Sequence, residues 1–520
     1  MKMHAYKPRY IAATVTATFM YFMTIVPLLA EAGTNAGSRE KVSTSASTEV
    51  SVPGVLSEEA AGAIKSASAT RNAPFKALNV IRAILPTVTA TSDMAHIEQK
   101  LHQEATDPPI IGTGLDIPEL NWVGAVKSNF FHLDATAGGS LFGMRILSVG
   151  AVGIRLGLLI EHIPAEARFA FFTADSDEAV APPVNGDEIV KLLALNLAAG
   201  DSSNEGRTYW SPVVKGEEVV ILVYVPKDID PNELRFTIPR ISHIFKEPLS
   251  DKAAGACNLD TTCYSSWSDE AKAVAKMVFT ESGDSFLCTG SLLADQDQSS
   301  MIPYFLSANH CISTQTVASS LETYWFWQSA SCNDSARDSR YSMLTEGAQL
   351  LYANSTSDTS FMRLNSQPPV GVSYLGWTTE DPSIGANVTG IHHPHGDRKK
   401  ISFGDFEGFY PYLGSTPVTN GNHIGIYWTL GTSEGGSSGS PLLNNSGQVI
   451  GQLHGGGASC STPNEMDYYG RFDLAYDAKL KLWLGGGNSQ QPDFVVTSII
   501  LNPAAPTANS TFSATVSVKT

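Results

Sequence analysis

The chain has 520 residues, of which 42% are hydrophobic and 16% are charged, so it has room for more than one domain with a sizeable core. Its net charge of −17 argues against nucleic acid as a partner, because nucleic-acid phosphates are repelled by an acidic protein. The 44 glycines and 28 prolines favour turns and short strands over long helices.

The first 32 residues have the pattern of a secretory signal peptide. Lys2, Lys7 and Arg9 precede an apolar run from Ile11 to Ala30, and Ala30-Glu31-Ala32 offers a cleavage site of the small-x-small type. An uncleaved anchor is the alternative, because about 20 apolar residues can span a bilayer. We expect a secreted, extracellular protein that has no membrane contact after the signal is removed.

Residues 33–109 are predicted to form a low-complexity leader or linker. From Gly33 to about Thr70 the sequence is rich in Ser, Ala, Thr and Glu and has few large apolar side chains, which is typical of poor order. A helical piece is expected from about Ala77 to Leu101, before the break at Asp107-Pro108-Pro109.

A β-rich domain is predicted for residues 110–252. Ile146–Ile160 and Glu218–Val225 are rich in Val, Ile and Leu and are separated by Pro, Gly and Asp turns, while Ile189–Leu197 fits either a strand or a short helix. This region has no paired carboxylates, metal-ligand spacing, nucleophile motif or cysteine. We therefore expect a separable folded domain without chemistry of its own.

Residues 253–485 contain all six cysteines and many short apolar or alternating runs, which predict an all-β sandwich or barrel. Helices are expected only at Ser268–Met277 and Leu474–Leu484. An even number of cysteines in an exported protein favours three disulfides over a zinc site, and no CxxC pair occurs. The predicted strands include Phe286–Leu293, Tyr304–Leu306, Tyr324–Trp327, Thr359–Leu364 and Gly425–Trp428.

Residues 486–520 comprise a Gly-rich linker and alternating strands that begin near Pro492. Two or three strands are too few for an independent β-sandwich. We therefore expect a truncated, β-sandwich-like tail.

The most informative stretch is Gly435-Gly436-Ser437-Ser438-Gly439-Ser440-Pro441. Such a tight loop can hold Ser438 Oγ outward while the N–H groups of Gly436 and Ser438 converge on one point, as an oxyanion requires. A flexible Ser/Gly linker is the alternative. The strand pattern of Gly447–Leu453 favours a loop within a folded core.

Two further segments can supply a base and an orienting acid for Ser438. Ser307-Ala308-Asn309-His310-Cys311 places His310 after a buried strand and beside a cysteine that can pin the turn. Asp358 lies at the start of an alternating strand, where an aspartate is usually only a cap. Each signal is weak alone, but the three occur together.

In order, local context and spacing, these residues resemble the chymotrypsin-like serine proteases, and within that family the bacterial lysyl endopeptidases. The likeness is also carried by Cys288-Thr289-Gly290-Ser291-Leu292, Ile391-His392-His393-Pro394 and Gly451-Gln452-Leu453-His454-Gly455-Gly456. It implies a mainly β fold in which a trypsin-like double β-barrel protease domain follows a β-rich prosegment domain. It also implies a serine endopeptidase in which Ser438 is the nucleophile, His310 the general base and Asp358 its orienting acid.

The resemblance further implies the disulfides and the substrate pocket. The disulfides would be Cys257–Cys460, Cys263–Cys332 and Cys288–Cys311, although six cysteines alone allow 15 connectivities. Asp467 would form the base of the primary pocket, with Gly455 and Thr432 as walls and His454 lining the site beside His310. A buried carboxylate favours a cationic substrate side chain, lysine by family likeness, although electrostatics alone would also admit arginine.

The resemblance gives the upstream domain a role as an inhibitory or folding-assisting prosegment, with self-processing between Lys252 and Ala253. We expect a monomer that needs no cofactor or metal, because His392, His393 and His395 lack a nearby carboxylate or cysteine partner in the sequence. The tail resembles the first strands of bacterial immunoglobulin-like adhesion modules. The alternatives are a glutamyl-specific protease, which Asp467 disfavours, and a non-catalytic secreted binding or adhesion protein.

Overall fold

The computed structural model describes residues 48–49, 85–90, 108–121, 129–135, 138–248, 253–297, 300–485, 495–502 and 513–519. Contacts divide the chain into a large unit, residues 41–484, and a small unit that includes the tail from Gly485. The predicted signal peptide, most of the leader and the junction residue Lys252 lie outside the described residues. Among the helices that are described, none is long and apolar enough to cross a membrane.

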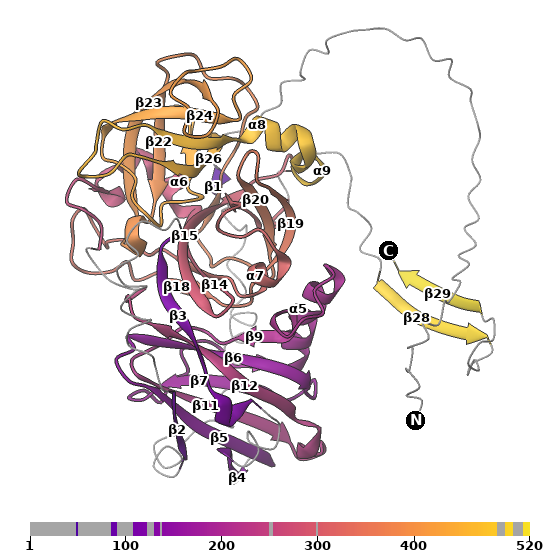
Figure 1. The fold of residues 1–520 in the computed structure, drawn as a ribbon. Coiled ribbons are helices and arrows are strands. Elements are labelled where there is room, and N and C mark those ends of the chain that lie inside the picture. Colours follow the sequence, from indigo (N-terminus) through magenta and orange to yellow (C-terminus); the bar gives the residue numbers. More distant parts are fainter. Residues whose placement is uncertain are drawn as a thin grey trace, which may run out of the picture. The chain divides into compact units, whose positions relative to one another are not determined.

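The N-terminal part of the large unit, residues 85–248, is a β-sandwich (Figure 1). One sheet is built from β2 (Thr87–Ala90), β4 (Phe131–Ala135), β5 (Gly139–Ser148), β7 (Arg168–Thr173), β8 (Val184–Asn185) and β11 (Glu218–Pro226). The other contains β3 (Ile110–Asp116), β6 (Gly153–His162), β9 (Thr208–Trp210), β10 (Val214–Lys215) and β12 (Arg235–Ile244). Alternate apolar residues of β6 and β11 belong to one buried core, as the period of two in a strand requires.

The structure decides one open prediction for this part and corrects another. Ile189–Leu197 is helical, within α5 (Gly186–Ala198). The expected helix over Ala77–Leu101 is wrong in its described part, because Thr87–Ala90 forms β2, parallel to β5. The β-branched Thr-Val-Thr sequence after Pro86 favours a strand once a sheet edge is available, and that edge lies more than fifty residues further along the chain.

Strand β3 connects the sandwich to the cysteine-containing part (Figure 1). It pairs with β12 in the sandwich and, through Gly112 and Ile110, with Ser285 and Phe286 of β15 (Asp284–Leu293). Ile111 is buried in the same apolar cluster as Leu287 and Trp327. The two parts of the large unit therefore share one continuous sheet.

The first barrel is a curved sheet in the order β18-β17-β14-β15-β16-β20-β19. Besides β15, its strands are β14 (Val274–Glu281), β16 (Tyr304–Ala308), β17 (Glu322–Trp325), β18 (Ser342–Leu344), β19 (Ala348–Asn354) and β20 (Thr359–Leu364). The expected helix Ser268–Met277 is too long, since α6 ends at Lys272 and the following Val-Ala-Lys-Met stretch enters β14. Pairing on both sides, with β15 and β17, outweighs its local helical pattern.

The second barrel closes on itself, because its strands follow the order β23-β22-β25-β26-β27-β24 and β23 also pairs with β24. These strands are β22 (Asn387–His392), β23 (Lys400–Tyr410), β24 (His423–Leu430), β25 (Pro441–Leu443), β26 (Val449–Gly456) and β27 (Asp467–Arg471). The two barrels confirm the expected mainly β, trypsin-like double-barrel architecture.

Short elements complete the structure. The predicted C-terminal helix is confirmed as α8 (Phe472–Ala475), η8 (Tyr476–Leu480) and α9 (Lys481–Leu484) in succession. In the small unit, β28 (Val495–Asn502) and β29 (Ser513–Lys519) form an antiparallel pair. Other short elements include β1 (Thr48–Glu49), which pairs with β21 (Ser373–Tyr374), β13 (Leu259–Asp260), which pairs with β23, and α7 (Gln315–Ser319).

Candidate active site

Ser438 lies in the loop between β24 and β25, and two glycines give this loop its shape. Gly436 and Gly439 have φ angles of +92° and +79°, a region that residues with a Cβ rarely adopt. A Cβ on Gly439 would also come within 2.1 Å of Ser307 Oγ and 2.8 Å of the Ala308 nitrogen. The serine loop thus packs directly against the strand end that precedes His310.

The peptide groups around Ser438 are oriented by their carbonyl oxygens. The Gly435 carbonyl accepts a hydrogen bond from the His395 N–H (2.6 Å), and the Ser437 carbonyl accepts one from the Ser440 N–H (3.0 Å). In a trans peptide the N–H points away from the C=O of the same plane. The N–H groups of Gly436 and Ser438 therefore point to the side opposite the Gly435 and Ser437 carbonyl oxygens.

His310 is held by Asp358 through two contacts. Its backbone N–H donates to Asp358 Oδ1 (2.9 Å), and its Nδ1 lies 2.7 Å from Asp358 Oδ2. An ionised carboxylate can only accept, so Nδ1 carries the proton and Nε2 keeps the lone pair that a general base uses. Asp358 therefore contacts both the backbone and the ring of His310.

Asp358 has an unusual backbone conformation, with a φ of +48°. Its carbonyl accepts hydrogen bonds from the Asn309 N–H (3.0 Å) and from Gln452 Nε2 (3.3 Å). Aspartate tolerates this left-handed conformation better than most residues. The strained turn brings the carboxylate under His310 while the strand that follows, β20, stays paired with β16.

All six cysteines form the three pairs that the resemblance implies. They are Cys257–Cys460, Cys263–Cys332 and Cys288–Cys311. The last pair joins β15 to the residue directly after His310. It therefore fixes the histidine turn to a central strand of the first barrel.

Asp467 is buried at the start of β27, and neutral donors surround its carboxylate. Oδ2 accepts from Trp428 Nε1 (2.7 Å) and Ser433 Oγ (2.6 Å). Neutral donors stabilise a carboxylate without cancelling its charge. Ser433 belongs to the serine loop, five positions before Ser438. Asp467 is therefore hydrogen-bonded to the loop that holds Ser438.

The predicted pocket walls also lie near Asp467. Gly456 is paired with Asp467 and Gly455 with Tyr468 across β26 and β27, and a Cβ on Gly456 would come within 2.5 Å of Asp467 Oδ1. Thr432 is buried directly before Ser433. The predicted pocket residues therefore lie close together. Trp428 and Ser433 also contact Asp467, and the sequence did not single them out.

His454 lies beside His310 and Asp358, as the resemblance implies. Its ring is stacked on His310 at 5.3 Å and on Tyr412 at 3.5 Å, and its Nδ1 lies 3.8 Å from Asp358 Oδ2. Tyr412 and His423, which also contacts His454, were missed in the sequence. Their only signal in the sequence is an aromatic residue two positions after β23 and a histidine at the start of β24.

His392, the last residue of β22, contacts the serine loop through its side chain. His392 Nδ1 lies 2.8 Å from Ser437 Oγ and its Nε2 lies 3.0 Å from Ser402 Oγ. Burial, and then the charge of Lys400, lower the pKa of His392 to about 3, so the ring is neutral. Both ring nitrogens are thus occupied by hydroxyl groups that fix the backbone beside Ser438.

The N-terminal sandwich also reaches this site. The Pro109 carbonyl accepts from the Leu287 N–H (3.1 Å), and Pro109 Cγ would lie 3.1 Å from a Cβ on Gly435. After the predicted junction, Ala253 is exposed, and the Gly255 N–H donates to Glu434 Oε2 (2.8 Å). Segments on both sides of Lys252 therefore contact the serine loop.

Two sequence-family models match the chain. The one described as "Lysyl endopeptidase, C-terminal domain" matches residues 252–470, and the one described as "Lysyl endopeptidase N-terminal domain" matches residues 84–245. A lysyl endopeptidase from Pseudomonas aeruginosa is 35% identical over 301 residues, which are 54% of this chain and 64% of that protein. The secreted RxLR effector protein 73 from Plasmopara viticola is 30% identical over 215 residues, 39% of this chain and 50% of that protein. The chain thus spans between half and two thirds of the length of these relatives.

Solved structures of proteases share low overall similarity with the chain. The Rv3671c protease from M. tuberculosis in its active form has a TM-score of 0.30 and 18% identity, and the match covers 44% of this chain and 89% of that chain. The HtrA-type protease AlgW with a tripeptide has a TM-score of 0.30 and 18% identity, over 42% of this chain and 62% of that chain.

Proposed function

Because the chain belongs to the lysyl endopeptidase family of serine proteases, we propose that it is a secreted endopeptidase that cuts peptide bonds after lysine. The observation that carries the proposal is the contact of His310 Nδ1 with Asp358 Oδ2 at 2.7 Å, next to the loop that holds Ser438. A binding protein would have no need of this oriented base.

In the proposed mechanism Ser438 Oγ attacks the carbonyl carbon of the scissile bond and His310 Nε2 takes the hydroxyl proton. The negative oxygen of the tetrahedral intermediate accepts from the N–H groups of Gly436 and Ser438, and each such donor contributes about 3 kcal/mol. When the C–N bond breaks, His310 returns the proton to the leaving amine. Water then attacks the acyl-enzyme by the same route and releases the acid and free Ser438.

The lysine preference is assigned to Asp467. The Asp467 carboxylate is buried and accepts hydrogen bonds from the neutral donors Trp428 Nε1 and Ser433 Oγ, and its negative charge favours a substrate whose ammonium group can pair with it. A glutamate side chain would be repelled by the same carboxylate.

The experiment is cleavage of three peptides that differ only in the residue before the cut, which is Lys, Arg or Glu. We expect kcat/KM to be highest for the Lys peptide and Glu to be cut negligibly. Equal cleavage after Lys and Arg would contradict the lysine preference, and preferred cleavage after Glu would indicate the glutamyl-specific alternative. No cleavage of any peptide would favour a binding protein.

The N-terminal sandwich is proposed to be the prosegment of this enzyme. Its strand β3 adds to β15 of the first barrel and its Pro109 covers the Gly435 side of the serine loop, so it is suited to assist folding and to block the site. Self-processing after Lys252 would separate it. Sequencing of the secreted mature chain is expected to begin at Ala253, and a mature chain that keeps residues 110–245 covalently attached would contradict the proposal.

A buried ion pair holds the sandwich to the first barrel. Arg155 Nη2 lies 3.2 Å from Glu322 Oε1 and donates to the Ser320 carbonyl (2.9 Å), while Arg155 Nη1 donates to Thr280 Oγ1 (2.8 Å). Both charged side chains are at most 1% exposed. The pair therefore joins the two parts at a point from which water is excluded.

Replacing Arg155 with Met is expected to destabilise the full-length protein by about 3–5 kcal/mol, because Glu322 then stays buried without a countercharge. Urea unfolding of the Ser438→Ala full-length chain, which cannot process itself, measures this loss. Lys191→Met is the matched control, since it removes the exposed Lys191–Asp187 pair of α5 and should not change the unfolding midpoint measurably. Equal effects of the two substitutions would show that the Arg155–Glu322 pair does not anchor the prosegment.

A further inference from the structure

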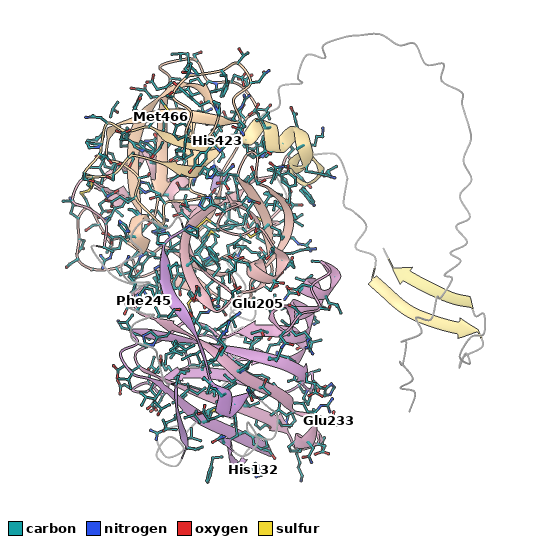
Figure 2. The ribbon with its side chains drawn as sticks, in the orientation of Figure 1. His132, Glu205, Glu233, Phe245, His423 and Met466 are labelled. Carbon is teal, nitrogen blue, oxygen red and sulfur yellow. A yellow bond between two sulfur atoms is a disulfide. The ribbon has the colours of Figure 1, made fainter. Side chains whose placement is uncertain are left out.

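His423, labelled in Figure 2, begins β24 and lies outside the three residues of the proposed mechanism. Its Nε2 is 2.8 Å from Nδ1 of His454, and its Nδ1 is 2.9 Å from Oδ1 of Asn422. The ring is buried and 5.2 Å from the Tyr412 ring. These contacts form a hydrogen-bonded series, Asn422–His423–His454, that ends beside Asp358.

The positions of the protons along this hydrogen-bonded series follow from the contacts of Asn422. Asn422 Nδ2 donates to the carbonyl of Thr356 (2.7 Å), and of the two polar atoms of the Asn422 side chain only the nitrogen can donate. The Asn422 atom that faces His423 is therefore Oδ1, an acceptor, so His423 Nδ1 must carry a proton. In the neutral ring His423 Nε2 is then an acceptor.

The ring of His423 is neutral, because burial, and then the charge of His454, lower its pKa to about 4. The titratable groups packed around it are His454 from β26, Asp358 from the turn before β20, and Tyr410 and Tyr412 from the end of β23 and the loop after it. Arg471 from β27 is engaged with the Gly421 carbonyl (3.0 Å) and with Asp473. With Nε2 of His423 as an acceptor, Nδ1 of His454 must be the donor.

This donor has two acceptors within range of a small ring rotation. His423 Nε2 is at 2.8 Å, a hydrogen-bond distance, whereas Asp358 Oδ2 is at 3.8 Å, beyond one. The same Oδ2 atom accepts from His310 Nδ1 at 2.7 Å. If His423 offered no acceptor, Asp358 Oδ2, 3.8 Å away, would be an alternative acceptor for the Nδ1 proton of His454.

We propose that His423 is a positioning residue that binds the Nδ1 proton of His454 and thereby reserves Asp358 for His310. This inference rests on the proposed function, since Asp358 matters here only as the partner of a catalytic base. The Tyr412 ring stacks on the His454 ring at an interplanar angle of 4° and limits its tilting. His423 sets which atom of that ring donates, and to which acceptor.

The test is the pH profile of kcat/KM for a lysyl peptide in His423→Phe and His423→Gln. Phe keeps the ring and removes the acceptor, whereas Gln restores the pattern, with Nε2 as donor to Asn422 and Oε1 as acceptor from His454. For His423→Phe we expect kcat/KM to fall about tenfold, and its acid limb to move to lower pH because a shared Asp358 stabilises the His310 imidazolium less. His423→Gln should recover most of this loss.

A double-mutant cycle separates this role from packing. In the His454→Phe background, which has no Nδ1 donor, His423→Phe should cause no further loss and no shift of the acid limb. Rates are expressed per active site, from titration with a serine-directed reagent, so that misfolded protein does not count. An equal loss in both backgrounds, or an unchanged acid limb in His423→Phe, would overturn the inference while leaving the protease function intact. A chain inactive in every form would contradict the proposed function as well.

Discussion

Replacing Ser438 with Ala is expected to lower kcat for a lysyl peptide by about 10⁵- to 10⁶-fold, because no acyl-enzyme can form without its hydroxyl. The N–H groups of Gly436 and Ser438 remain, so the peptide should still bind with an affinity within about twofold of the original. A loss of catalytic activity with retained peptide binding is what we expect when a nucleophile is removed. Peptide hydrolysis and calorimetric binding on the same preparations measure the two quantities.

Ser440→Ala is the matched control, because Ser440 lies two residues further along the same loop and shares its burial. We expect this variant to keep most of its activity. A loss as large as that of Ser438→Ala would mean that the loop conformation, rather than one hydroxyl, is what the substitution removes.

Replacing Asp467 with Asn is expected to lower kcat/KM for a lysyl peptide on the order of 100-fold, because removing one partner of a buried charge pair costs roughly 3 kcal/mol. A peptide with an uncharged residue of similar length before the cut should change little. Asn can still accept from Trp428 Nε1 or Ser433 Oγ, so the pocket should keep its shape. Kinetics with the two peptides separate charge from shape.

Asp405→Asn is the control for this substitution, since it removes a negative charge from β23 of the same barrel where the carboxylate contacts Asn387. It should leave the preference for lysine unchanged. If Asp467→Asn reduced cleavage of both peptides equally, Asp467 would support the fold and the lysine preference would need another source.

The sequence was sufficient to predict the parts of the site whose signals are local. The loop around Ser438 and the box around His310 have small residues and a cysteine at fixed offsets, which define tight turns wherever they occur. Asp358 was a weaker signal, because its contact with His310 depends on a φ of +48°, which the neighbouring residues in the sequence do not predict. The disulfide pairs followed from the family resemblance and not from spacing.

The parts that were missed arise from pairing between distant strands. Tyr412 and His423 reach His454 because β23, β24 and β27 close the second barrel, and Ser433 reaches Asp467 across the same closure. The helix predictions were wrong at residues 87–90 and at Met277, because the backbone there pairs with strands from distant parts of the sequence. Such contacts have no local signature.

The sequence around Arg155 does contain a signal that could have predicted a buried partner. Arg155 stands in the apolar run from Ile154 to Ile160, where a charged residue requires a buried partner. The partner, Glu322, is 167 residues further along the chain and could not have been chosen from sequence alone. A charge within an apolar strand is thus evidence of an interface even when the other side is unknown.

The central claim is that Ser438 carries out covalent catalysis on lysyl substrates. The most direct measurement is rapid acid quenching of the mature protein with a lysine ester, followed by mass spectrometry of the active-site peptide. The attack forms an ester between Ser438 Oγ and the lysyl acyl group and releases the alcohol, so we expect that acyl mass on Ser438, and not on Ser437 or Ser440. Steady hydrolysis of the ester without a Ser438 adduct, or an adduct on another residue, would contradict the account.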